Sequence, residues 1–263
     1  MSSDEMNQEL SYPFEITRVV QYLREREKEE GGFSFVPDLY PCIDDTYYAV
    51  RTLQLLRADV DPDKTAKYLR SIDWREAGFP RAIYMLVYLH RSLNIECPPQ
   101  LTDLLKRDWA RFQALDVQYF SDEIQNLLNK PLRPLASISP FQFHRQDNLQ
   151  GLRKKVSVLL NHGIDFDREE IIRWVQLCQN GDGGFGFYPI TTSFMENTYC
   201  ALEILSKLNS SPLEIGVCRE YILNCQTKGG GFGRAPMSFP FIESTFHAVT
   251  GWFFLDEMEV REK

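Results

Sequence analysis

The sequence predicts an all-α protein in which pairs of helices repeat along the chain. Three observations lead to this prediction: a Gly-Gly-Phe motif occurs three times, the same residue types surround each copy at fixed distances, and apolar residues recur at helical spacing around it. A fixed period of this kind is the signature of a repeat architecture. Because one helix pair cannot bury its own apolar face, the pairs must stack or close into a ring.

The three copies of the motif are residues 31–33, 183–185 and 230–232. Counted from the Phe, each copy has an acidic residue at +11, a Thr at +13, an aromatic residue at +14 and an Ala at +16. In chain order the acids are Asp44, Glu196 and Glu243, the threonines Thr46, Thr198 and Thr245, the aromatics Tyr47, Tyr199 and Phe246, and the alanines Ala49, Ala201 and Ala248. Three gapless matches of this length indicate copies of one structural unit.

Each unit is predicted to contain a helix, a glycine-rich turn, a proline-containing loop and a second helix. In the second copy, Ile171, Trp174 and Val175 recur at helical spacing, and residues 181–184 supply the turn that ends this helix. Pro189 keeps the following loop extended. The second helix is expected to begin at the acid of the unit, because a carboxylate in the first turn is stabilised by the positive end of the helix dipole.

The middle of the chain is expected to hold two further units in altered form. The first and second copies of the motif are 152 residues apart, whereas the second and third are only 47 apart. Residues 78–79 (Gly-Phe) mark one altered unit, in front of the apolar stretch 82–89. Residues 101–128 are helical by pattern without the motif, and residues 149–160 resume a helix. We therefore expect five or six helix pairs.

The composition excludes several classes of protein. The 263 residues carry a net charge of −8, which argues against binding to nucleic acid or anionic lipid. Nothing in the sequence resembles the long apolar run of a membrane span. The first ten residues are polar and acidic, unlike a signal peptide, and the six scattered cysteines fit reduced, buried side chains. We expect a cytoplasmic protein with a polar tail at residues 1–12 and a single domain at residues 13–263.

Two segments resemble the repeat of the prenyltransferase and squalene-cyclase superfamily. They are residues 179–186 (Gln-Asn-Gly-Asp-Gly-Gly-Phe-Gly) and residues 225–233 (Cys-Gln-Thr-Lys-Gly-Gly-Gly-Phe-Gly). In that superfamily a Gln ends the outer helix, and Gly-Gly with an aromatic residue leads to the inner helix. The resemblance implies an α/α toroid, in which an outer ring of helices surrounds an inner ring and a central cavity. It also implies an apolar, isoprenoid-like ligand and a possible protein partner subunit.

Residues 42–46 (Cys-Ile-Asp-Asp-Thr) resemble the Asp-x-Asp-Asp-Thr motif of class II terpene cyclases, whose middle Asp donates a proton. The resemblance implies that Asp44 is the proton donor and Asp45 its tuning partner, with Cys42 replacing the first Asp. The repulsion between two adjacent negative charges makes it costly to ionise both carboxyl groups, so one of them would keep its proton. A second interpretation also fits, because Asp44 lies at the repeated acid position and would then be a helix-start carboxylate.

Six other residues are candidates for substrate binding. The aromatic residues of the repeat would form the cavity wall, although aromatics at such positions also build cores. The acids could act as a general acid and base at the cavity mouth, or belong to the scaffold. These candidates are Tyr47, Tyr199, Phe246, Glu196, Glu243 and His247.

The protein prenyltransferases of the superfamily use a catalytic zinc, held by an Asp-x-Cys pair and a His. Ser244 takes the place of that His, and His247 lies three residues further on. Glu196 and Phe194 occupy the places of the Cys and the acid, and the chain contains no Asp-x-Cys. The resemblance therefore disfavours zinc, and we expect no cofactor. No sequence feature resembles the positively charged diphosphate site of these enzymes.

The leading functional hypothesis is an isoprenoid-processing enzyme that resembles a class II terpene cyclase, with an apolar central cavity and an Asp proton donor. Two alternatives stay open. The first is a non-catalytic toroid that binds a lipid, a peptide or a partner subunit. The second is a prenyltransferase-like enzyme that lacks the usual zinc ligands.

Overall fold

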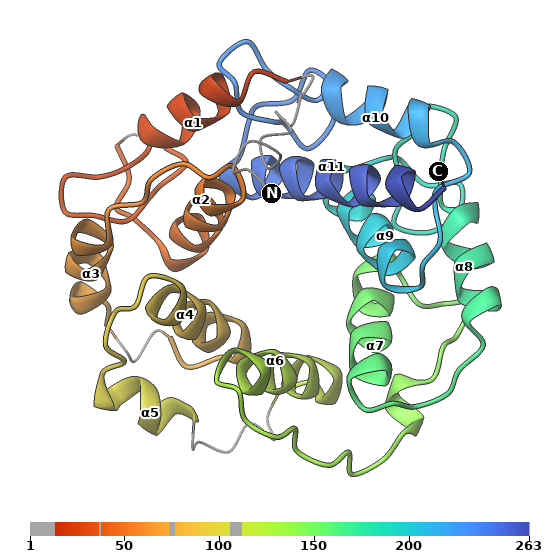
Figure 1. Cartoon of the computed structure of the whole chain (residues 1–263), viewed down its shortest axis with the longest axis horizontal. Helices are drawn as coiled ribbons and strands as arrows, with labels where there is room; N and C mark the ends of the chain where they lie inside the picture. The colour runs from red at the N-terminus through yellow and green to blue at the C-terminus, as the bar shows by residue number, and fades with distance from the viewer. Residues whose placement is uncertain (1–13, 37, 74–76, 106–111, 263) are drawn as a thin grey trace, which may run out of the picture.

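A computed structural model describes residues 14–36, 38–73, 77–105 and 112–262, so the polar tail expected at residues 1–12 lies outside the described residues. Six helices of the described residues form an inner ring (Figure 1). They are α2 (Ile43–Leu55), α4 (Pro80–Ser92), α6 (Ala114–Leu127), α7 (Leu149–Asn161), α9 (Met195–Lys207) and α11 (Ile242–Glu262). Each contacts the next in this order, and α11 contacts α2, so the ring is closed.

The outer layer surrounds this ring (Figure 1). It consists of α1 (Ile16–Arg24), α3 (Pro62–Ser71), α5 (Pro99–Leu105), the 3-10 helix η1 (Ser139–Phe141), α8 (Arg168–Leu177) and α10 (Ile215–Asn224). Extended structure in the described residues consists of isolated β-bridges at the turns. The predicted all-α toroid is therefore confirmed, with six inner helices and η1 in the outer position that precedes α7. No described helix is both long enough and apolar enough to cross a membrane.

The middle of the chain departs from the repeat in two places. Phe79, expected to mark an altered unit, is the residue before α4 and is 41% exposed, whereas Phe33 of the first motif is buried. The region 101–128, helical by pattern, contains the end of α5 and the whole of α6. Neither unit has the buried Phe, and α5, with 7 residues, is shorter than the outer helices α1, α3, α8 and α10.

The repeated Phe and Thr are joined by the same hydrogen bond in all three units. The backbone N–H groups of Phe33, Phe185 and Phe232 donate to the hydroxyl oxygens of Thr46, Thr198 and Thr245, at 2.9, 3.0 and 3.0 Å. All six residues are buried. An unpaired buried N–H costs free energy, so the hydroxyl at +13 fixes the turn to the first turn of the inner helix.

The first glycine of the motif packs against the outer helix of the next unit. Gly230 has a φ of +93°, and a Cβ atom there would collide with the backbone carbonyl of Arg18 in α1. Gly183 has a φ of +87° and packs in the same way against Val217 of α10. Only glycine combines a positive φ with such a close approach. Because the turn of the last unit contacts the first helix, this packing helps to close the ring.

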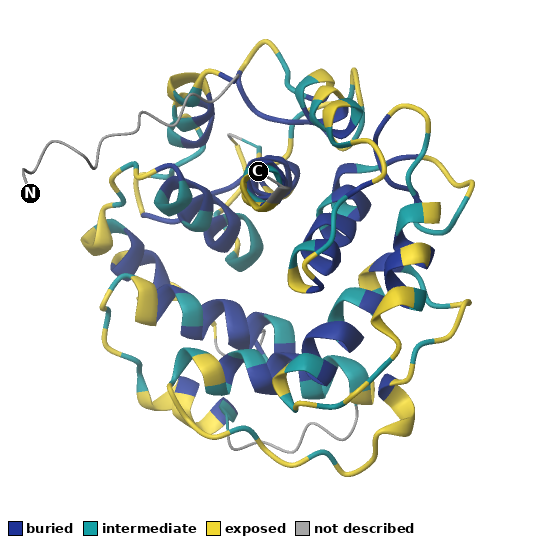
Figure 2. Cartoon of the chain, turned by 45° about the vertical axis from the view of Figure 1, so that its right-hand side comes forward, coloured by how far each residue is buried: buried dark blue, intermediate teal, exposed yellow. Residues whose placement is uncertain are grey.

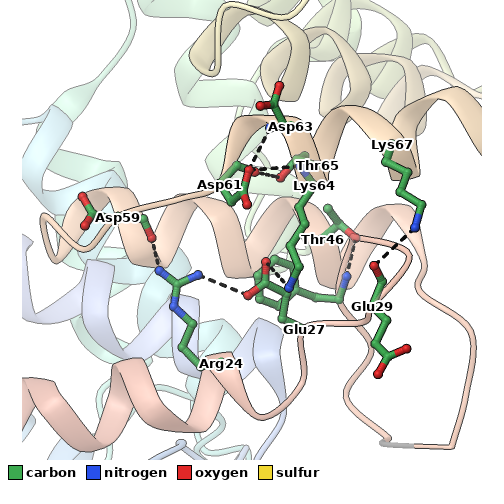
Figure 3. Close-up of polar contacts among 11 residues, drawn as sticks. Arg24, Glu27, Glu29, Thr46, Asp59, Asp61, Asp63, Lys64, Thr65 and Lys67 are labelled. Carbon is green, nitrogen blue, oxygen red and sulfur yellow. Dashed lines mark hydrogen bonds and ion pairs between the residues drawn. The ribbon is translucent and has the colours of Figure 1, made fainter.

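Polar contacts reinforce the junction between the first and second units (Figure 3). Lys64 of α3 lies 3.6 Å from Glu27, which follows α1, and Lys67 donates to the carbonyl oxygen of Glu29 at 3.5 Å. The carboxylate of Asp61 accepts from the backbone N–H groups of residues 63 and 64 and so caps α3. The outer helix of one unit is thereby held to the turn of the unit before it.

The inner helices are mostly buried, whereas exposed residues lie mainly on the outer helices and loops (Figure 2). The repeated alanines at +16, Ala49, Ala201 and Ala248, are fully buried. A small side chain at this position lets neighbouring helices approach closely. The core therefore lies around the inner ring, and the inner face of that ring is left to line a cavity.

We predict that Thr198→Val lowers the free energy of unfolding by about 1–3 kcal/mol, because the new side chain keeps the shape but leaves the N–H of Phe185 unpaired. Urea denaturation measures the change. Thr192→Val, in an exposed part of the loop before α9, is the matched control and should stay within about 0.5 kcal/mol of the wild type. Equal stability of the two variants would contradict the role given to the hydroxyl.

Candidate functional site

A central cavity of about 510 Å³ lies inside the ring. All six inner helices contribute lining residues, and these lie in the N-terminal halves of the helices except for Arg51, which is in the third turn of α2. Arg234 and Phe241, in the loop before α11, complete the wall. Because helix N-termini carry partial positive charge, six helix dipoles direct their positive ends toward this region.

The structure brings together seven of the eight site residues predicted from the sequence. The lining includes Asp45, Tyr47, Glu196, Tyr199, Glu243, Phe246 and His247. Asp44 is not among the lining residues. A position on the cavity wall does not show what a side chain does chemically. The roles in catalysis and substrate binding therefore stay predictions for all eight residues.

Aromatic rings form much of the wall, and they come from α2, α4, α6, α9 and α11. They are Tyr47, Tyr48, Tyr84, Tyr119, Phe120, Tyr199 and Phe246, and Phe241 of the loop before α11 adds one more. Neighbouring rings pack edge-on or tilted, with centroids 5.1 Å apart for Tyr48 and Phe246 and 5.7 Å apart for Tyr84 and Phe120. Burial raises the pKa values of Tyr84, Tyr119 and Tyr199. These phenols are therefore neutral at physiological pH.

Arg51 is the third-turn residue of α2 on the cavity wall. Its guanidinium donates to the hydroxyl of Tyr47 at 2.5 Å, and that hydroxyl donates to Tyr84 at 3.1 Å. The guanidinium also lies over the rings of Phe246 and Tyr88, 4.7 and 5.1 Å from their centroids. No carboxylate of the described residues forms an ion pair with it.

The other cations of the lining each have an acidic partner. Arg81 pairs with Asp44 at 2.6 Å and Glu243 at 3.5 Å, Arg234 with Glu196 at 2.7 Å, Arg153 with Glu203 at 3.1 Å, and Lys154 with Asp116 at 2.6 Å. Both acids predicted at the cavity mouth, Glu196 and Glu243, therefore form ion pairs with arginines. Such pairs compensate the charges on both sides.

Asp44 and Asp45 differ in their surroundings. The carboxylate of Asp44 is 44% exposed and bound to Arg81. Asp45 lines the cavity and accepts a hydrogen bond from the backbone N–H of Phe35 at 3.0 Å. Burial raises the pKa of Asp45, although the bond from Phe35 acts against this shift, and the nearby charge of Asp44 adds to it. Of the two carboxyls, Asp45 is the one in contact with the cavity.

His247 stacks on Tyr199, with ring centroids 4.6 Å apart and an interplanar angle of 19°. Burial, together with the positive charges of Arg153 and Arg81, lowers its pKa from 6.5 to about 3. Glu243, one helical turn before His247 on the same helix, forms an ion pair with Arg81 instead. In the described part of the chain, no three His, Cys, Asp or Glu side chains are grouped as a metal site would require.

A family model, the prenyltransferase alpha-alpha toroid domain, matches residues 2–88 and 144–263. The chain belongs to this family. The matched ranges contain both ends of the toroid, and the unmatched middle contains α5 and α6, the units that lack the motif.

Among solved structures, the toroid is similar to a Candida albicans protein geranylgeranyltransferase-I complexed with GGPP. The identity is 14% and the TM-score 0.39, over 92% of this chain and 76% of that one. No curated protein matches the chain.

Sequence reasoning missed the basic residues of the cavity, above all Arg51 and Arg153. The repeat contains a signal for the first of them. Position +18 from the motif Phe holds Arg51, Glu203 and Thr250 in the three units, whereas positions +11 to +16 are largely shared. Arg51 also lies four residues after Tyr47, on the same helix face. A charge beyond the first turn of an inner helix, at a position that the repeat does not fix, indicates a requirement other than scaffold.

Because His247 is buried in its neutral form, we predict that the stability of the fold depends on pH. In the unfolded chain an imidazole binds a proton near pH 6.5, whereas in the folded protein His247 stays neutral down to about pH 3. Its contribution to stability is therefore complete above pH 6.5 and decreases as the pH falls, by about 2 kcal/mol between pH 7 and pH 5.

Urea denaturation at pH 7, 6 and 5 checks this prediction. The fall in unfolding free energy should be smaller for His247→Gln than for the wild type, by about 2 kcal/mol over this range. His144→Gln, on an exposed loop, should follow the wild type. If His247→Gln keeps the full pH dependence, the burial of a neutral imidazole does not cause it.

Proposed function

We propose that the chain binds an isoprenoid-like, largely apolar molecule in the central cavity. The observation that supports this most directly is the set of eight Tyr and Phe rings in the wall of a cavity of about 510 Å³. Pockets for small ligands commonly enclose roughly 300–1,000 Å³ and are lined mainly by apolar and aromatic side chains. Aromatic rings offer large apolar areas, and each Å² of apolar surface removed from water contributes about 25 cal/mol.

The cavity favours this proposal over the toroid that binds only a partner protein. In a purely structural ring, side chains would fill the centre, whereas this ring keeps a space bordered by all six inner helices. A peptide or a partner subunit at the outer surface would not need an aromatic interior. The family's description as a prenyltransferase domain also fits an isoprenoid ligand. The six free cysteines fit the proposed location in the reducing cytoplasm.

Filling the cavity tests this proposal. Ser244 lines the cavity, so the indole of Ser244→Trp should occupy space that the ligand needs. We expect binding of farnesol, farnesyl diphosphate and squalene to the purified protein, measured by calorimetry or tryptophan fluorescence, and at least a tenfold weaker affinity in Ser244→Trp, which corresponds to about 1.4 kcal/mol. Ser92→Trp, at the exposed end of α4, is the matched control. Absence of binding across the whole panel would refute the proposal.

A second candidate is acid catalysis of the class II cyclase kind, with Asp44 as proton donor and Asp45 as its tuning partner. Burial raises the pKa of Asp45 at the cavity wall, which supports a carboxyl of this pair that keeps its proton, although Asp45 is the tuning partner and not the proposed donor. The ion pair of Asp44 with Arg81 acts against it, since that contact uses the charged form of the donor.

For this candidate, product analysis after incubation with squalene-type polyenes and prenyl diphosphates is the test. Loss of a general acid commonly costs about 10²–10⁴-fold in rate, so Asp44→Asn and Asp45→Asn should each abolish measurable turnover. Asp38→Asn, in the exposed loop before α2, should retain it. Full activity of Asp44→Asn, or unchanged substrates with the wild type, would exclude the cyclase assignment.

A further inference from the structure

We propose that the rim of the cavity mouth is a docking surface for a second copy of this chain, so that two toroids associate face to face. The rim consists of residues 34–36, 38–42, 186–194 and 233–241, in the loops that precede α2, α9 and α11. This inference concerns the outer edge of the mouth, and it does not depend on which ligand the cavity binds.

The three loops of the rim form one continuous surface at the N-terminal ends of the inner helices. The ring of Phe35 in the first loop lies 5.2 Å from the ring of Phe241 in the third, measured between centroids. The guanidinium of Arg234 in the third loop lies 4.0 Å from the ring centroid of Phe194 in the second, and the carbonyl oxygen of Arg234 accepts from the N–H of Met195 at 2.8 Å. One partner can therefore contact all three loops together.

Large apolar side chains project from the rim into solvent. Tyr40 and Phe239 are 92% and 86% exposed, and Ile190 and Met237 are 96% and 101% exposed. Side chains of this size are normally buried, and single exposed ones need no explanation. Several of them on one continuous surface are typical of a site of interaction.

Two of these side chains also occupy strained backbone positions. Ile190 and Met237 are each the third residue of a β-turn, at residues 188–191 and 235–238, which a backbone hydrogen bond of 3.3 or 3.1 Å closes. Their φ angles are +67° and +62°. Gly or Asn is favoured at such a position, and a β-branched residue there is an outlier. The isolated fold gains nothing from an exposed Ile or Met at these turns, so both indicate a contact outside the chain.

The charge of the rim favours a second copy as the partner. Asp38 and Arg234 are the only charged residues in its sequence, so the rim has no net charge, whereas the whole chain carries −8. Two copies of an acidic protein repel each other over most of their surfaces, but that repulsion is weakest where both present a neutral face. A strongly acidic or basic partner would find no complementary charge on the rim.

The groups beside the rim favour a protein over a bilayer. Arg81 pairs with Asp44 and Glu243, and Arg234 with Glu196, and most of these side chains are partly exposed to water. Insertion into hydrocarbon would remove that water at a high cost, whereas a protein surface can supply hydrogen bonds. Tyr, Phe, Met and Arg are enriched in protein interfaces and Lys is depleted, and the rim contains the first four and no Lys.

Docking of a second rim would also complete the cavity. Phe241 and Arg234 belong to the rim and line the cavity as well. A partner that covers them therefore separates the mouth from bulk water. In a two-fold arrangement the same patch is used on both subunits, so one interface closes two cavities.

Analytical ultracentrifugation of the purified chain without ligand, over a series of protein concentrations, tests the inference. We expect the wild type to reach twice the chain mass of 30.7 kDa. A variant that combines Ile190→Asn with Met237→Asn removes two apolar tips and keeps the turns, because Asn accepts a positive φ. Its dissociation constant for the dimer should be about 100-fold higher or more. Far-UV circular dichroism checks that it is folded, and Tyr40→Ser with Phe239→Ser repeats the test at the other two tips.

Leu177→Asn combined with Val260→Asn is the matched control, because these exposed apolar side chains lie at the ends of α8 and α11, outside the rim. It should keep the dissociation constant of the wild type. A wild type that stays monomeric at every concentration, a rim variant that still dimerises as the wild type does, or a control that loses the dimer would each overturn the inference. A monomeric wild type that sediments with phosphatidylcholine vesicles would assign the rim to neutral lipid instead. None of these outcomes bears on ligand binding in the cavity, so the proposed function is tested separately.

Discussion

The structure depends on one hydrogen bond that is made three times, from the N–H of the motif Phe to the hydroxyl of the Thr thirteen residues later. This bond holds the glycine turn against the start of an inner helix and so sets the rotation of that helix. Once the rotation is set, the aromatic ring at +14 lines the cavity in all three units and the acid at +11 does so in two of them (Glu196 and Glu243), while the Ala at +16 is buried in the core. The cavity wall is therefore a consequence of the same bond that builds the unit.

Ring closure gives the units a shared centre. Gly230 of the last unit packs on Arg18 of the first outer helix, as Gly183 packs on the following unit. In an open stack the inner faces would be a concave surface, whereas the closed ring encloses them on all sides. The cavity is bordered by both α2 and α11, which contact each other because the ring is closed. The cavity therefore depends on ring closure.

The repeat made the fold and seven of the lining residues predictable, but it did not indicate the basic residues of the wall. Residues such as Thr198 and Tyr199 recur because every unit needs them, and recurrence is visible in one sequence. Arg51 occurs once, and its lack of a carboxylate depends on which side chains other helices bring to it. The irregular units around Phe79 and α6 were found only by spacing, because they lack the hydrogen bond that defines the others.

Position +18 makes the sides of a nearly symmetric ring chemically different. Arg51 and Glu203 occupy this position in different units, and Glu203 is paired with Arg153 and Lys207. The side of the cavity near α9 therefore has a compensated charge cluster, whereas the side near α2 has a guanidinium without a carboxylate. A symmetric aromatic wall would accept an apolar chain in several orientations. Different residues at one scaffold position remove that equivalence.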